Sequence, residues 1–192
     1  MPGQTYLALL DVANSQYGYV TADDARAVDV DPAQLRLMHH RGTLERLAQG
    51  LYRFPTIPST ALDQYMEATL WPRTLAVLSH DTALDLHELC DVNPARIHLT
   101  VPADYRLRRT LPAGYELHPR PLDNDDTASH EGIPIVTVAR AILDGVQRGL
   151  GGQLLDQAVA TGMGRGLLTP ADLEAITTAR QARNQRRHEV GV

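Results

Sequence analysis

Several short patterns in the sequence combine residue types that catalyse reactions in other proteins. The run Ser79-His80-Asp81 contains the three residue types of a hydrolytic triad. Neighbouring residues on a helix point about 100° apart, so these three side chains cannot form a proton relay with one another. We therefore interpret Ser79 as the N-cap of a helix over residues 80–89, and the two following residues as its first turn.

The patterns typical of metal and phosphate sites are incomplete. His80 and His87 are seven residues apart, whereas zinc ligands on one helix usually lie four residues apart. The eight histidines form no cluster in the sequence. The glycines at 149–152 and 162–166 do not form a GxGxxG motif after a strand, so we interpret them as helix caps and turns. We expect no bound metal and no cofactor.

One set of residues keeps an enzymatic alternative open. His80, His87, Arg140 and Asp144 combine acid–base and anion-binding side chains on predicted helices that could face a common cleft. An enzyme that modifies a partner protein or RNA would use such a set. Because no catalytic signature accompanies them, we favour a function without catalysis.

The composition is that of an ordinary soluble globular protein and excludes several enzyme classes. The chain of 192 residues has 18 arginines and no lysine, which rules out a Walker A lysine, a Schiff-base lysine and a kinase-type lysine. Its one cysteine, Cys90, allows no internal disulfide and is typical of the reducing cytoplasm. No apolar stretch approaches the roughly 18 residues of a membrane span, and we identify no signal peptide. We expect a cytoplasmic protein without a membrane partner.

The first part of the chain has the element order of a winged helix-turn-helix. Apolar spacing and cap residues predict helices over residues 4–16, 22–28 and 32–41. Residues 44–54 then predict two short strands joined by a turn at residues 48–50.

The third predicted helix and the hairpin after it carry a basic patch. Residues 36–53 contain four arginines and one glutamate, whereas the net charge of the whole chain is −5. The third helix of a winged helix fits the B-DNA major groove, about 12 Å wide, where arginine and glutamine read guanine and adenine. Arginines of the hairpin would contact phosphates. A winged helix that binds protein is the alternative. The predicted DNA-binding residues are Gln34, Arg36, His40, Arg41, Arg46, Gln49 and Arg53.

The rest of the chain predicts a mixed α/β domain after a proline-containing linker. Helical patterns alternate with strands, which we expect at 97–101, 115–117 and 133–136. The first of these alternates apolar and polar residues, the period of a half-buried strand. The proline at position 134 predicts that the last one is an edge strand.

These elements predict an α+β fold class. We expect a winged helix-turn-helix DNA-binding domain at residues 1–55. A mixed α/β domain with a small sheet flanked by helices follows at residues 59–180. The arginine-rich tail at 181–192 is expected to be mobile.

Three stretches of the chain, in this order and at this spacing, form a recognisable pattern. They are Gly18-Tyr-Val-Thr21 through Arg41-Gly42-Thr-Leu44 and Gly50-Leu-Tyr52, then Leu78-Ser-His-Asp-Thr-Ala-Leu84 with Ile97-His-Leu-Thr-Val-Pro102, then Gly132-Ile-Pro-Ile-Val-Thr137 with Ala139-Arg140-Ala-Ile-Leu-Asp144. Over roughly residues 5–180 the sequence thereby resembles the AbiEi-type antitoxins of AbiE-like, type IV toxin–antitoxin systems. The family often has a threonine where this chain has Ala141.

The resemblance implies two functions. The winged helix would bind inverted repeats in the promoter of its own operon and repress it, with two copies on the operator. The C-terminal domain would counteract a nucleotidyltransferase-like toxin, either by direct binding or indirectly. A regulator or adaptor without a toxin, and an enzyme that modifies the toxin, are the alternatives. Our candidates for the toxin-facing surface are Asp81, Asp85 and Glu88, together with Arg106, Arg108 and Arg109.

Overall fold

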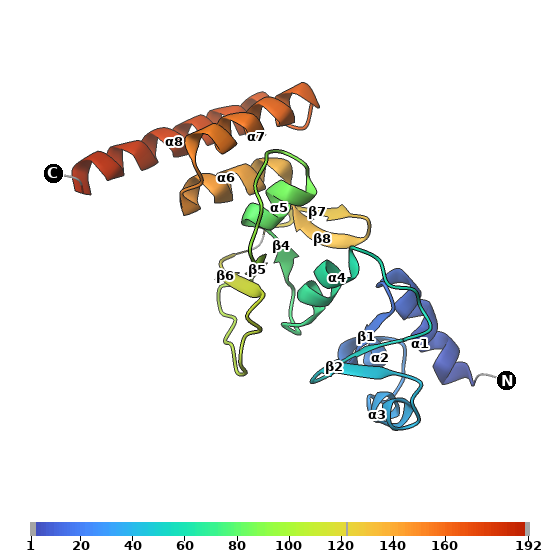
Figure 1. Ribbon diagram of the computed structural model, residues 1–192. Helices are drawn as coiled ribbons and strands as arrows, with labels where there is room; N and C mark the ends of the chain where they lie inside the picture. Colours follow the sequence, from blue (N-terminus) through green and yellow to red (C-terminus); the bar gives the residue numbers. More distant parts are fainter. Residues whose placement is uncertain (1–2, 122, 191–192) are drawn as a thin grey trace. The chain divides into compact units, whose positions relative to one another are not determined.

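The computed structural model describes residues 3–121 and 123–190, and for residues 187–190 it describes the helix without the side chains. The chain divides into two compact units (Figure 1). Unit 1 comprises Met1–Ala76 and Glu131–Ile133, and unit 2 comprises Val77–His130 and Pro134–Val192. Helices together with an antiparallel and a mixed sheet confirm the predicted α+β class.

Unit 1 is a winged helix with one additional helix. Its helices are α1 (Gln4–Ser15), α2 (Ala22–Ala27), α3 (Ala33–His40) and α4 (Asp63–Leu70). Its antiparallel sheet has the order β1–β3–β2, formed by β1 (Tyr19–Thr21), β2 (Glu45–Ala48) and β3 (Leu51–Arg53). The three predicted helices and the predicted hairpin are confirmed. Strand β1 was not predicted, because three residues are too few to show a strand period.

Local signals begin and end these helices. The Thr21 hydroxyl accepts a hydrogen bond from the Asp24 backbone N–H at 3.0 Å, and the Asp24 carboxylate accepts one from the Thr21 N–H at 2.8 Å. This reciprocal pair is a capping box and begins α2. Before α3, the Asp31 carboxylate accepts from the Ala33 N–H at 2.8 Å. After α3, Gly42 adopts a left-handed φ of +75°, which favours glycine.

The hydrophobic core of unit 1 determines how α3 is rotated. Leu9 of α1, Leu35 of α3 and Phe54 after β3 are completely buried in it. The Tyr6 and Phe54 rings meet edge to face with their centroids 5.6 Å apart. Because Leu35 and Met38 point into this core, the opposite side of α3 faces solvent.

The predicted linker between domains lies inside unit 1. Helix α4 belongs to the same unit, which ends at Ala76. Arg53 at the end of β3 and Asp63 at the start of α4 form a buried ion pair of 3.0 Å. The proline-containing segment at 55–58 therefore connects two parts of one unit. The limits of the DNA-binding segment, residues 1–55, stay a prediction.

Unit 2 contains a five-stranded mixed sheet with the order β6–β5–β4–β8–β7. Its strands are β4 (Val77–Leu78), β5 (Ile97–Val101), β6 (Tyr115–Pro119), β7 (Thr127–His130) and β8 (Ile133–Val136). Its helices are α5 (His80–Leu86), α6 (Val138–Arg148), α7 (Gly152–Gly164) and α8 (Pro170–Val190), with a short 3-10 turn at Asn124–Asp126. Helix α6 packs against α5, α7 and α8 (Figure 1).

Cap residues again mark the helix ends of unit 2. Ser79 is the N-cap residue of α5, as predicted, but its hydroxyl pairs with the Nδ1 atom of His80 at 2.8 Å instead of a backbone N–H. Gly149 ends α6 with a left-handed φ of +103°, and Gly151 precedes α7. The interpretation as helix caps is therefore confirmed for Gly149 and Gly151, whereas it is wrong for Gly162 and Gly164, which lie within α7.

One prediction for unit 2 is wrong. Strand β8 lies between β4 and β7 and is not an edge strand. Its pairing with the two-residue strand β4 is short, at Leu78–Ile135, which explains why Pro134 is tolerated. The tail at 181–192 continues α8 as far as Val190, with residues 191–192 outside the described chain, and its mobility stays a prediction. In the described residues, no helix has both the length and the apolar character needed to cross a bilayer.

Candidate functional site

Helix α3 presents the predicted base-reading side chains to solvent. Gln34, Arg36 and His40 are exposed, whereas Leu35 and Met38 are buried. Glutamine and arginine side chains can each make paired hydrogen bonds to base edges in the major groove. The core of unit 1 therefore holds α3 in the rotation that DNA reading would require.

The end of α3 and the β2–β3 hairpin extend this exposed surface. Arg41 is the C-cap of α3, Arg46 lies on β2, Gln49 lies in the hairpin turn, and all three are exposed. The Arg46 Nε atom donates a long hydrogen bond of 3.4 Å to the Ala48 carbonyl, which keeps the side chain near the turn. The exposed residues, named here the α3–wing surface, are Gln34, Arg36, His40, Arg41, Arg46 and Gln49.

Arg53 does not belong to the α3–wing surface. It is 9% exposed, and its Nη2 atom donates to the Asp63 carboxylate at 3.0 Å, the Ile57 carbonyl at 2.9 Å and the Ser59 hydroxyl at 2.9 Å. Burial tends to raise the pKa of Asp63, but hydrogen bonds from Thr60 and Arg53 outweigh it and lower that pKa overall. The structure therefore contradicts the prediction that Arg53 contacts phosphate, because its donors are used inside unit 1.

Unit 2 contains a buried polar layer on one face of its sheet. His98 and Thr100 of β5 are 2% and 0% exposed, although their alternation with apolar residues predicted a half-buried strand. In the parallel β5–β6 pair, His98 lies opposite Glu116, and Thr100 lies opposite His118. Residues that pair in register, or that lie two apart on a strand, share a face of the sheet. The four side chains are therefore grouped by the strand register itself.

Three histidines meet in this layer. The His80 and His118 rings stack with their centroids 3.6 Å apart, and His98 Nδ1 lies 3.0 Å from His118 Nε2. Burial, helped by nearby positive charge, lowers the pKa of His80 to about 2 and that of His98 to about 4. Burial also lowers the pKa of His118, so neutral imidazoles are favoured near pH 7. We name these three residues and Glu116 the histidine cluster.

The expectation that the histidines form no cluster is therefore wrong. His80, His98 and His118 come from α5, β5 and β6, so no spacing within one helix could reveal them. One signal was present in the sequence. Glu116 and His118 lie two residues apart on a strand, which places both on one face. In the described part of the chain, the residues whose ligand atoms could surround a metal ion are His98, Glu116 and His118.

A buried carboxylate beside the histidine cluster binds arginines. Asp144 is completely buried, and its Oδ1 atom accepts from Arg140 at 2.9 Å through Nε and at 2.6 Å through Nη2. Its Oδ2 atom lies 3.5 Å from Arg120 Nη2 and 3.7 Å from His80 Nδ1. At the start of α6, the Thr137 hydroxyl accepts from the Arg140 N–H at 3.4 Å. The third stretch of the family pattern thus caps α6 and places a charged pair in the polar layer.

The residues of the enzymatic alternative converge only in part. His80, Arg140 and Asp144 lie together, whereas the Nε2 atom of His87 pairs with the Val136 carbonyl at 2.8 Å. His80 is 7% exposed and Asp144 is 0% exposed, which leaves little room for a substrate to reach them. This burial favours a structural role for the Arg140–Asp144 pair.

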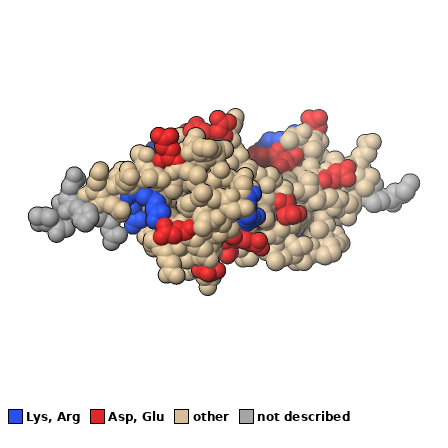
Figure 2. Space-filling view, turned by 90° about the horizontal axis from the view of Figure 1, so that it is seen from above, with Lys and Arg blue, Asp and Glu red and all other residues tan. Residues whose placement is uncertain are grey.

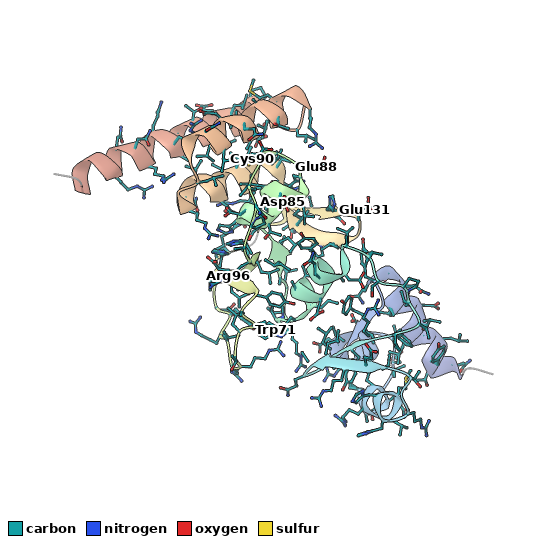
Figure 3. The ribbon with its side chains drawn as sticks, viewed as in Figure 1. Trp71, Asp85, Glu88, Cys90, Arg96 and Glu131 are labelled. Atoms are coloured by element: carbon teal, nitrogen blue, oxygen red, sulfur yellow. The ribbon has the colours of Figure 1, made fainter. Side chains whose placement is uncertain are left out.

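An acidic pocket of about 400 Å³ lies next to the C-terminal end of α5. Asp85, Glu88 and Asp91 line it, with Gln157 and Thr161 of α7; Figure 3 shows the first two close to Cys90. Two hydrogen bonds of 3.1 and 2.9 Å between Asp91 and Gln157 tie the segment after α5 to α7. Burial raises the pKa of Asp85. A pocket with this charge suits a cationic side chain of a partner.

The other candidates for the toxin-facing surface lie elsewhere in unit 2. Asp81 is half-buried, and its Oδ2 atom lies 3.9 Å from Arg148 Nη1. Arg106 and Arg108 are exposed in the loop between β5 and β6, where Arg109 is half-buried. On the face shown in Figure 2, acidic side chains are scattered widely and basic ones occupy a few places. That face therefore carries no continuous basic coat.

The geometry of unit 1 agrees with a comparison against protein families. Residues 8–55 match the family described as transcriptional regulator, AbiEi antitoxin. The winged helix therefore resembles that of the AbiEi antitoxins. The match confirms the resemblance predicted from the sequence, and supports the role of an antitoxin and DNA-binding regulator. A regulatory antitoxin family is also consistent with the prediction of a function without catalysis. The match covers the winged helix and does not extend into unit 2.

A solved structure shares the fold over nearly the whole chain. The crystal structure of RV2827C protein from Mycobacterium tuberculosis matches with a TM-score of 0.58 and 16% sequence identity. The match covers 95% of this chain and 75% of that chain. At this identity the likeness shows a common fold. A search of curated proteins found no match.

Proposed function

We propose that this protein is an antitoxin that represses the promoter of its own operon through the α3–wing surface and neutralises a nucleotidyltransferase-like toxin through unit 2. The observation that carries the proposal is the exposed side of α3. Gln34, Arg36 and His40 face solvent in a winged helix whose sequence matches the AbiEi regulators. A base-reading side that is held outward by a core is what a regulator needs.

The small number of arginines on this surface supports binding by two copies. With Arg53 buried, the phosphate contacts of one winged helix rest chiefly on Arg41 and Arg46. Each phosphate contact adds about 0.9 to the slope of log K against log salt, so one copy should bind weakly. Two copies on inverted repeats, about one helical turn of roughly 34–36 Å apart or a multiple of it, would bind cooperatively.

A gel-shift titration against the DNA upstream of the gene, at two salt concentrations, tests the DNA-binding half. The Arg36→Ala, Arg41→Ala, Arg46→Ala triple variant should lose the specific shift. Arg26→Ala is the matched control, because Arg26 is exposed and pairs with Asp23 outside the α3–wing surface. A shift that survives in the triple variant, or binding to one repeat that gains nothing from the second, would contradict the proposal.

The acidic pocket is the part of unit 2 that we propose meets the toxin. Asp85 and Glu88 line it beside the uncharged side chains of α7, so a basic side chain of the toxin would find both charge and shape there. Co-expression with the toxin tests this site. Asp85→Lys with Glu88→Lys should abolish growth rescue and co-purification. Glu174→Lys on α8, an exposed acidic residue away from the pocket, should leave both unchanged.

Two results would contradict part of the proposal for unit 2. Full rescue by the Asp85→Lys, Glu88→Lys variant would exclude the pocket as the toxin-facing site. Rescue by the native protein without co-purification would favour indirect antagonism. The neighbouring reading frame discriminates further, because a nucleotidyltransferase-like product there favours an antitoxin over a regulator or adaptor without a toxin.

A further inference from the structure

The histidine cluster places three metal-ligating atoms around one point. His98 Nδ1 lies 3.0 Å from His118 Nε2 and 3.9 Å from Glu116 Oε1, and His118 Nε2 lies 3.8 Å from the same oxygen. Nitrogen of histidine and oxygen of glutamate are ligands that zinc and related divalent ions accept.

The triangle of these atoms has the size that such an ion requires. In the plane of the triangle, the point equidistant from the three atoms lies about 2.1 Å from each, and Zn–N and Zn–O bonds measure about 2.0–2.2 Å. Two histidines and one glutamate are also the protein ligands of a known class of open zinc site, in which water or a ligand occupies the fourth position. A tetrahedral ion lies outside this plane, so the Glu116 carboxylate, whose side chain is 32% exposed, would move closer to the two histidines when the ion binds.

The strands hold the three ligands without help from a loop. His98 and Glu116 are register partners in the parallel β5–β6 pair, and His118 follows two residues later on the same face. Thr100, the register partner of His118, is completely buried, and its Oγ1 atom has no hydrogen-bond partner among the described residues. An unsatisfied hydroxyl at this depth indicates that the layer holds a further polar species.

The exposure of the cluster suits an incoming cation. The Glu116 side chain is 32% exposed and that of His118 is 22% exposed, whereas that of His98 is 2% exposed. The ion would therefore enter from the Glu116 side and meet the buried histidine last.

We propose that His98, Glu116 and His118 bind a divalent transition metal ion, preferentially zinc, in unit 2. The proposal does not depend on the toxin or on DNA, and it replaces the expectation of no metal.

The arginine at the end of α6 competes with the ion for the same place. Arg148 Nη1 lies 2.6 Å from His98 Nδ1 and 3.6 Å from Glu116 Oε1. A guanidinium and a divalent cation cannot share these atoms, because both are positive. The Arg148 side chain is 36% exposed at the last residue of α6, so it can turn into solvent when the ion enters. Removing it should strengthen metal binding.

To test the proposal, the 192-residue protein is stripped of metal with EDTA and dialysed. It is then titrated with zinc chloride in a calorimeter near pH 7. We expect one ion per chain. Co²⁺ as a second probe should give the visible absorption bands of a low-symmetry, near-tetrahedral site. His118→Ala and Glu116→Gln should each weaken Zn²⁺ binding by about 100-fold or more, and Arg148→Ala should strengthen it about tenfold. His130→Ala is the matched control, since His130 lies on β7, in contact with His87 and outside the cluster.

Circular dichroism of each variant separates loss of metal from loss of fold. Glu116→Gln keeps the shape of the side chain, so it decides the matter if His118→Ala does not fold. Equal Zn²⁺ affinity in the native protein and both ligand variants would overturn the proposal, as would loss of binding in His130→Ala alone. Weaker Zn²⁺ binding in Arg148→Ala would contradict the competition between the arginine and the ion.

Discussion

Replacing Arg53 with alanine should destabilise unit 1 strongly. The Asp63 carboxylate, with 11% of its side chain exposed, would lose the guanidinium that lies 3.0 Å away. The Ile57 carbonyl and the Ser59 hydroxyl would lose a donor at 2.9 Å each. Removing one partner of a buried ion pair lowers the free energy of unfolding by about 3–5 kcal/mol. Because both side chains keep a little exposure, we expect about 3 kcal/mol.

The single tryptophan makes this change measurable in unit 1. Trp71 is 6% exposed and belongs to unit 1, so its fluorescence during urea unfolding reports on that unit. Arg46→Ala is the matched control. Arg46 is exposed, so its removal should change the free energy of unfolding by no more than about 0.5 kcal/mol. It should instead reduce the salt slope of DNA binding by about 0.9.

The two variants should therefore show opposite behaviour. Arg53→Ala should lower the free energy of unfolding, and the folded fraction should keep the salt slope of DNA binding of the native protein. Arg46→Ala should keep the free energy of unfolding and reduce the salt slope. Adding Asp63→Asn completes a double-mutant cycle, which should give a coupling of at least about 1 kcal/mol. Our reasoning is refuted if Arg53→Ala unfolds at the same urea concentration as the native protein and lowers the salt slope of DNA binding as Arg46→Ala does. Arg53 would then contact phosphate.

Three further predictions concern unit 2. Asp144→Ala should lower the free energy of unfolding by about 3 kcal/mol or more, measured by urea unfolding with circular dichroism, because Arg140 loses its buried partner; a near-native midpoint would contradict this. Since burial lowers the pKa of His98 to about 4, the unfolded chain takes up the proton first as the pH falls. Stability should therefore decline between about pH 6.5 and 4, by up to about 1.4 kcal/mol per pH unit for this histidine, and a pH-independent melting temperature would refute it. A Cβ added at Gly162 would lie 2.9 Å from a Leu168 methyl group. Gly162→Ala should therefore lower the free energy of unfolding by about 1–2 kcal/mol in the same assay. Gly164→Ala is the control and should not, because nothing lies within 4 Å of a Cβ added there.

The winged helix could be predicted because its signals are local. A capping box at Thr21, a left-handed glycine at position 42 and a glycine turn in the hairpin act within a few residues. The periodicity of α3 likewise indicated which side is buried, and Gln34 and Arg36 are exposed as expected. These features depend on local backbone propensity and on whether each residue is apolar or polar, and both follow directly from the sequence.

Whether an individual charged residue is buried or exposed depends on tertiary contacts. Arg53 shares the sequence neighbourhood of Arg41 and Arg46, yet it is buried because Asp63 of α4 faces it. No local pattern specifies that a carboxylate ten residues away will fold back onto β3. The basic patch was therefore predicted with one arginine too many.

By itself, the sequence determined the order of the elements, the winged helix and the exposed face of α3, because helix caps and apolar periods act over a few residues. Only the tertiary structure decided the polar layer of unit 2. The alternation in β5 left open what covers the polar face, and His80 of α5 and Arg148 of α6 contact His98 there. His80, His98 and His118 meet because three elements pack against one another, and such long-range contacts leave no period in the sequence.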